Sequence, residues 1–149
     1  SSTDKMFKGI GVFNSLDWSE SPKEVLEWTL AHLEDDGYCF VTTILSSGLD
    51  SLVLGANSET LLPPDRLNCL SFEGINTLAE KVGFKVVEFS TPGSLDLQNI
   101  EDNLLENHDQ HDLFQYLFKI RKDENLIKEL QTFLQSNRIS SRARIVLQK

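Results

Sequence analysis

Several residue types are scarce in this sequence of 149 residues, and each scarcity excludes a class of protein. The two cysteines, Cys39 and Cys69, are too few for a disulfide framework and lack metal-ligand spacing, so we expect reduced thiols. Eight glycines and four prolines argue against fibrous and low-complexity chains. No apolar run approaches the ~18 residues of a membrane span, and no charged-then-apolar leader is visible. We therefore expect a cytoplasmic globular protein.

Positive charge is scarce as well, because 14 Lys and Arg oppose 23 Asp and Glu and leave a net charge of −9. Such a surface repels nucleic acid phosphates and anionic lipid, so we expect neither nucleic acid nor membrane as a partner. The late basic residues either hold an anionic substrate or are solvated and ion-paired: Arg138, Arg142, Arg144 and Lys149.

The hydrophobic residues, 40% of the chain, follow the pattern of an α/β layered fold. Strands are predicted over 8–14, 38–45, 84–90 and 142–147. One helix is predicted to begin at the capping box of Ser21 and to stop at 35–37, and another follows from Ser71 to Val82. The strand at 38–45 lacks clean alternation, which favours a sheet covered by helices on both faces.

The remaining segments complete a single predicted domain, 1–149. We expect residues 1–7 to be disordered, or to be a remnant that does not belong to the domain. Residues 46–70 are predicted to form a long irregular connection, and such loops often carry function. Residues 95–137 are predicted to be an α-helical insertion of about three segments.

Polar residues follow the first predicted strand, over Asn14–Glu20. Ligands of open parallel sheets bind beyond the carboxyl ends of the strands, which is where this segment lies. Asp17 would orient or deprotonate a substrate hydroxyl there, and Trp18 would form a pocket wall. Alternatively, Asp17 is solvated and Trp18 packs on the following helix. Phosphate-binding loops of the G-x-G-x-x-G and Walker kinds are absent, as is a G-x-S-x-G elbow.

The densest ionisable segment is 107–112, where His108 and His111 can share a helix face. Histidine and aspartate are metal ligands, so one hypothesis is a metal-dependent hydrolase. A polar connection between helices explains the segment with nothing added, and no third ligand is evident elsewhere. We therefore predict no metal site.

Four segments, in order, resemble motifs of the class I S-adenosylmethionine-dependent methyltransferases. They are 13–22 (F-E-V-L-E-H-V-x-D-P), 34–38 (the L-x-P-G-G turn), 63–71 (P-P-x-H-x-N-x-x-S) and 83–88 (G-F-x-V-x-E). Thr91–Asp96 resembles a T-P-G-x-L-D signature, and 133–137, 140–141 and 144–146 resemble its companions. These later segments suggest a bacterial subgroup that often accompanies polysaccharide or cell-surface biosynthesis.

The family's glycine-rich cofactor motif and its ribose-binding acid are absent, so the chain resembles the C-terminal half of the domain. The resemblance implies a Rossmann-like half-sheet of about four strands, the last antiparallel, with the helical insertion before it. It implies methyl transfer to a small molecule by the full-length protein. This chain alone is expected neither to bind S-adenosylmethionine nor to be active.

The resemblance also assigns roles to single residues, by motif position. Phe13, Asn14 and Ser15 would line the methionine end of the cofactor, and Asp17 would be the catalytic base. Trp18 and Arg66 would bind the substrate. In the family pattern, Asn14, Asp17 and Trp18 replace Glu, Glu and His, and Arg66 replaces a frequent His.

A half-sheet of this kind exposes the edge of its first strand, and such edges pair with other chains. We therefore expect a homo-oligomer through strand 8–14, or coverage of that edge by the chain's own residues. The alternative function is a non-catalytic interaction or dimerisation module.

Overall fold

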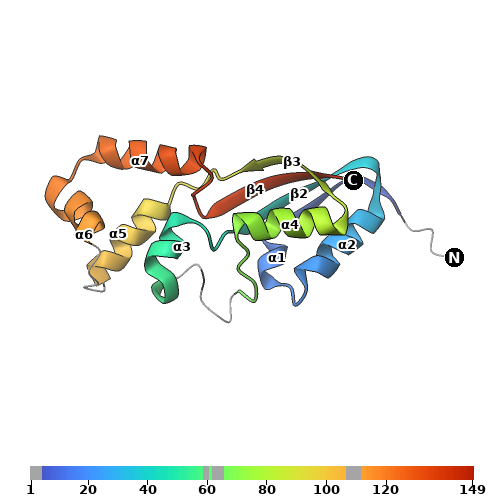
Figure 1. Cartoon of the computed structure of the whole chain (residues 1–149), viewed down its shortest axis with the longest axis horizontal. Helices are drawn as coiled ribbons and strands as arrows, with labels where there is room; N and C mark the ends of the chain where they lie inside the picture. The colour runs from blue at the N-terminus through green and yellow to red at the C-terminus, as the bar shows by residue number, and fades with distance from the viewer. Residues whose placement is uncertain (1–4, 59–60, 62–65, 107–111) are drawn as a thin grey trace.

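The computed structural model describes residues 5–58, 61, 66–106 and 112–149, with a mixed sheet at its centre (Figure 1). The strands lie in the order β1-β2-β4-β3. β1 (Phe7–Phe13) is parallel to β2 (Leu33–Ile44), whereas β4 (Arg142–Gln148) is antiparallel to β2 and to β3 (Lys85–Ser90). The predicted α/β fold with its antiparallel last strand is confirmed, and β1 is an edge strand.

Three helices pack on the sheet: α1 (Ser15–Trp18), α2 (Pro22–His32) and α4 (Phe72–Val82). Both longer helices begin at the predicted serine caps. The Ser21 hydroxyl accepts a hydrogen bond from the Glu24 amide at 3.3 Å, and the Ser71 hydroxyl accepts one from the Gly74 amide at 3.0 Å. Each cap satisfies a main-chain donor that the first helical turn leaves free.

The described helices cover one face of the sheet, so the expectation of helices on both faces is wrong for the described part of the chain (Figure 1). Val41 and Ile145 are buried on the covered face. Phe13, Tyr38 and Phe40 share the open face, where 64%, 40% and 47% of their surfaces are exposed. The alternation of β2 is hidden in the sequence because aromatic residues occupy its exposed positions.

Two further boundaries differ from the sequence predictions. α2 ends at His32, and the fully buried Leu33 begins β2, so the predicted stop at 35–37 lies inside a strand. Asp36 has a φ of 61°, which makes the start of β2 irregular. The connection at 46–70 is not wholly irregular, because it contains α3 (Leu49–Leu54) and the short helix η1 (Gly55–Asn57).

The predicted helical insertion is confirmed in the described residues as four elements that extend beyond one end of the sheet (Figure 1). They are α5 (Asp96–Glu106), α6 (Asp112–Gln115), the π-helical turn η3 (Tyr116–Arg121) and α7 (Glu124–Ser136). Together with α3 they enclose a second apolar core of Leu54, Leu97, Ile100, Leu104, Phe114, Leu117, Phe118 and Leu134. Within the described ranges, no helix has both the length and the apolar character needed to cross a membrane.

Candidate functional site

The turn that follows β1 places α1 at the carboxyl ends of β1 and β2. Asn14 has a φ of 52°, in the left-handed region that asparagine tolerates better than most residues. Its amide still donates to the Thr42 carbonyl at 2.8 Å, as the last bond of the β1–β2 ladder. The chain therefore turns sharply after this residue and brings Asp17 back over β2.

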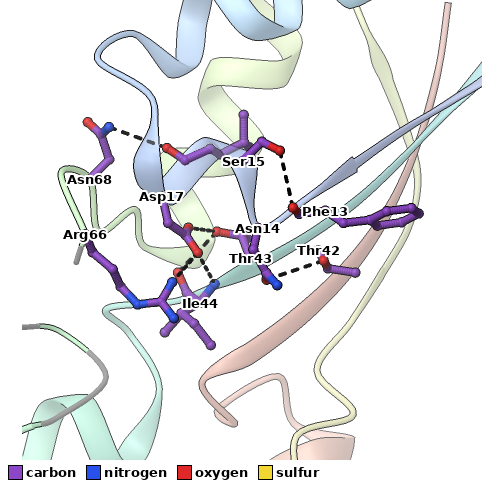
Figure 2. Close-up of polar contacts among 10 residues, drawn as sticks. Phe13, Asn14, Ser15, Asp17, Thr42, Thr43, Ile44, Arg66 and Asn68 are labelled. Carbon is purple, nitrogen blue, oxygen red and sulfur yellow. Dashed lines mark hydrogen bonds and ion pairs between the residues drawn. The ribbon is translucent and has the colours of Figure 1, made fainter.

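Asp17 is the centre of a buried polar cluster, with 2% of its surface exposed. Its Oδ1 accepts a hydrogen bond from the Thr43 hydroxyl, and its Oδ2 accepts one from the Ile44 amide at 3.4 Å (Figure 2). The Arg66 guanidinium completes the cluster, with its Nη1 at 2.5 Å from Oδ2. Two residues that the sequence assigned to substrate chemistry therefore form an ion pair with each other, in which the carboxylate is buried and the guanidinium is part-buried.

Asn68 ties the segment after Arg66 to α1. Its amide and the Leu67 amide donate to the Asp17 carbonyl at 3.0 and 2.8 Å. Its side-chain Nδ2 donates to the Ser19 carbonyl and, at 3.4 Å, to the Leu16 carbonyl. This asparagine is the Asn of the P-P-x-H-x-N-x-x-S motif, and its contacts give that motif position a structural role.

Burial raises the pKa of the Asp17 carboxyl above its ordinary value, while the Thr43 hydroxyl, the Arg66 charge and the Ile44 amide lower it. The net shift is upward, as expected of an acid removed from water. Burial also raises the pKa of the Cys69 thiol, and the nearby Asp17 charge raises it further. Burial raises the pKa of Cys39 to about 12. Both cysteines are free.

The other predicted site residues surround this cluster without joining it. The Ser15 hydroxyl donates to the Phe13 carbonyl at 3.2 Å, and the Asn14 Oδ1 accepts a hydrogen bond from the Thr42 hydroxyl at 3.4 Å. The Phe13 ring points away from Asp17 (Figure 2). Trp18 lies at the end of α1, with 54% of its surface exposed.

Sequence reasoning missed two members of the cluster, Thr43 and Asn68. Thr43 lies within a stretch of β-branched residues, which predicted a strand but gave no indication that its hydroxyl binds a carboxylate. Asn68 belongs to the P-P-x-H-x-N-x-x-S motif, so the resemblance could have identified it as a site residue. Within the segment of the metal hypothesis, 107–112, residues 107–111 with both histidines lie outside the described residues.

The two late signatures of the sequence meet in space around Asp96. The carboxylate of this fully buried residue accepts hydrogen bonds from the Ser140 hydroxyl at 2.6 Å, the Ser141 amide at 2.7 Å and the Gln131 side chain at 2.7 Å. The carbonyl of Gly93 accepts from Ser140 at 3.1 Å and from Gln131 at 3.0 Å. One polar network therefore contains residues of both late segments and Gln131 of α7, and it joins the insertion to the start of β4.

The comparisons with known proteins agree with this architecture. Residues 1–89 match a family model described as a methyltransferase domain, which is more than half of the chain. The chain belongs to this family. No curated protein sequence matches it. The T-P-G-x-L-D subgroup stays a prediction, because the family match ends before that signature.

Solved S-adenosylmethionine-dependent methyltransferases share the fold of this family member. One from Archaeoglobus fulgidus is 16% identical with a TM-score of 0.57, and the match covers 98% of this chain and 61% of that one. The mycolic acid cyclopropane synthase CmaA1, complexed with SAH and CTAB, is 16% identical with a TM-score of 0.53, covering 99% and 57%. One from Mesorhizobium loti is 10% identical with a TM-score of 0.52, covering 97% and 62%. The chain thus spans less than two thirds of these structures.

The residues present fit only one side of a cofactor cradle. β1 is the outermost strand in the described part of the chain, so no glycine-rich strand–loop–helix unit lies against its outer edge. The turn at 13–15 offers main-chain groups and the Asn14 amide at the carboxyl end of β1. These groups can contact the methionine end of S-adenosylmethionine, whereas a ribose-binding acid and the family's glycine-rich loop are missing from the sequence.

Proposed function

We propose that this chain forms the substrate-facing half of a cytoplasmic S-adenosylmethionine-dependent methyltransferase that acts on a small molecule. The observation that carries the proposal is the buried Asp17–Arg66 cluster at the carboxyl ends of two parallel strands, in a chain of the methyltransferase family. In such sheets this end is where ligands bind. The later signatures support a role in polysaccharide or cell-surface biosynthesis, through their resemblance to that subgroup.

Within this proposal, the bound cofactor supplies the electrophilic methyl group, and the chain orients the acceptor. Methyl transfer is an in-line displacement that depends mainly on proximity and orientation. Phe13, Asn14 and Ser15 would contact the methionine end. Asp17 would accept the acceptor's proton, and the upward shift of its pKa by burial supports this role, because a base works best near the ambient pH.

Trp18 and Arg66 would bind the acceptor in this scheme. Arg66 is paired with Asp17 in the structure, so the carboxylate would act as a base once acceptor binding separates the pair. Trp18 offers a large exposed indole beside the cluster. In a catalytically active, longer chain, Asp17→Asn should therefore lower turnover more than it weakens cofactor binding, and unchanged turnover would remove Asp17 as the base.

The test of the proposal is calorimetry with S-adenosylmethionine on two chains, this one and one extended upstream through a glycine-rich half. We expect a binding heat with the longer chain and none with this one, because only one side of the cradle is present here. Binding by neither chain would contradict methyl transfer.

The second candidate is a non-catalytic interaction module. It is favoured by the edge strand β1 and by the exposed aromatic residues of the open sheet face, Phe13, Tyr38 and Phe40. Exposed edges and apolar patches are typical of surfaces that bind another chain. A second copy of this chain is the partner that we propose for that edge.

A further inference from the structure

The four late basic residues have different surroundings in the structure. The Arg138 guanidinium lies over the Phe72 ring, 5.8 Å from its centre, and the Lys149 amine donates to a main-chain carbonyl at the start of β2 at 2.7 Å. These two cations hold parts of the fold together. The side chains of Arg142 and Arg144 form neither an ion pair nor a hydrogen bond with any residue that the structure describes.

Arg142 and Arg144 lie side by side on the open face of the sheet. They are the first and third residues of β4, both exposed, so their side chains leave the same face. In the β2–β4 register, Arg142 pairs with Ile44 and Arg144 pairs with Thr42. Both arginines therefore lie beside the carboxyl end of β2, next to the turn that follows β1.

A cavity of about 360 Å³ lies beside Arg142 at this end of the sheet. Ser94, Asn99 and Ser141 also line it, and the two serine hydroxyls have no hydrogen-bond partner among the described residues. Asp96 lines the cavity too, but its carboxylate already accepts hydrogen bonds from three donors. Thus the cavity offers a ligand the Arg142 guanidinium and two hydroxyl groups, all unpaired within the described part of the chain.

The charge of the chain makes this pair of arginines unusual. The sequence carries 23 acidic residues against 14 basic ones, yet no acidic side chain in the described residues pairs with either arginine. Residues two apart on a strand are roughly 7 Å apart, so the two like charges repel each other. An oxyanion between them would remove this repulsion, and the guanidinium fork matches carboxylate and phosphate oxygens.

We propose that Arg142 and Arg144 bind an oxyanion, the phosphate or carboxylate group of the methyl acceptor, at the carboxyl end of β2. The inference rests on the proposed function and deepens it, because it gives the acceptor a negative charge. Thr42, opposite Arg144, donates its hydroxyl to Asn14, so the anion would lie close to the segment assigned to the methyl donor.

The test is a titration of this chain with inorganic phosphate, followed by amide NMR at constant ionic strength. We expect the amide resonances of residues 42–44 and 141–144 to shift and to saturate as phosphate is added.

In the double variant Arg142→Gln with Arg144→Gln, phosphate binding should weaken about tenfold or more, because two charge-assisted contacts are lost. The double variant Arg142→Lys with Arg144→Lys keeps both positive charges but loses the paired donors of the guanidinium groups, so it should bind phosphate with intermediate strength. Arg121→Gln is the control for each single Gln variant, since it too removes one exposed positive charge, at a site in the insertion.

Several outcomes would overturn the proposal: shifts that do not saturate, equal binding by the double Gln variant, or weakening in the Arg121→Gln control. The substituted side chains are exposed, and if the double variant fails to fold, the two single Gln variants give the same test. The titration contains no cofactor. Its failure therefore leaves the calorimetric test of methyl transfer unaffected, and failure of calorimetry does not remove the anion site.

Discussion

At the scale of single residues, the balance between burial and ion pairing at Asp17 decides how stability depends on pH. The carboxylate has one cationic partner, Arg66, at 2.5 Å, but burial is the largest influence on its pKa and raises it. An acid with a raised folded-state pKa binds its proton more tightly when folded. Its stabilising contribution is therefore complete below the unfolded pKa, near pH 4, and is lost as the pH rises through the folded pKa.

We accordingly expect the stability of the wild-type chain, relative to the Asp17→Asn variant, to fall as the pH rises above about 4. The amide of the variant does not titrate, so the contributions of all other carboxyl groups cancel in the difference. Urea denaturation of both proteins from about pH 4 to about pH 8 measures it. A difference that instead grows with pH would mean that the Arg66 charge outweighs burial.

Asn68 offers a second prediction at this scale. Its Nδ2 donates to the carbonyls of Ser19 and Leu16, and it connects the segment after Arg66 to α1. Removal of the amide leaves part-buried carbonyl groups without a partner, so Asn68→Ala should cost about 1–2 kcal/mol of unfolding free energy. The matched control is Asn125→Ala, at an exposed position whose side chain forms no hydrogen bond with the residues that the structure describes. Equal effects on the urea midpoint would show that the bridging contacts contribute nothing.

At the scale of elements, the insertion is attached to the sheet by the hydrogen bonds of Asp96. Three donors converge on this buried carboxylate: Gln131 of α7, and Ser140 and Ser141 of the late signatures. Asp96→Ala should therefore destabilise the chain by about 3 kcal/mol, because it leaves these donors unpaired away from water. Asp102→Ala on the same helix removes an exposed carboxylate and should change stability little. Similar losses in the two variants, measured by urea denaturation, would contradict a special role for Asp96.

The elements that sequence predicts well are those whose signals are local. Ser21 and Ser71 each lie three residues before the amide that they cap, so the helix starts are visible in the sequence. The contact between Asp17 and Thr43 joins residues 26 positions apart, and it depends on the β1–β2 pairing, which no local pattern specifies. The uncovered face was missed for a related reason, since an exposed Phe40 has the same chemical character as a buried one.

At the scale of the whole molecule, the outer edge of β1 presents main-chain groups to which no other strand of the described chain bonds. The Asn14 amide bonds to β2, and amides alternate in direction along a strand of a parallel pair. The amides of Gly9, Gly11 and Phe13 therefore point away from the sheet. Gly9 and Gly11 carry no side chain that could shield these groups, and Phe13 adds an exposed apolar ring.

We expect the chain to self-associate through this edge, and Gly9→Pro should abolish the association. Proline removes an outward-pointing amide without removing a β1–β2 hydrogen bond, so the sheet should be retained. A strand from a second copy would lose a main-chain donor at the edge of β1 and could no longer pair there. Gly9→Ala is the matched control, since a Cβ there would meet its nearest atoms at 3.7 and 3.8 Å, in ordinary contact, and the amide stays. Sedimentation velocity over a range of concentrations should show association for the wild type and for Gly9→Ala, and a monomer for Gly9→Pro. A wild type that stays monomeric at the highest concentration, or a proline variant that associates as the wild type does, would exclude this edge as the interface.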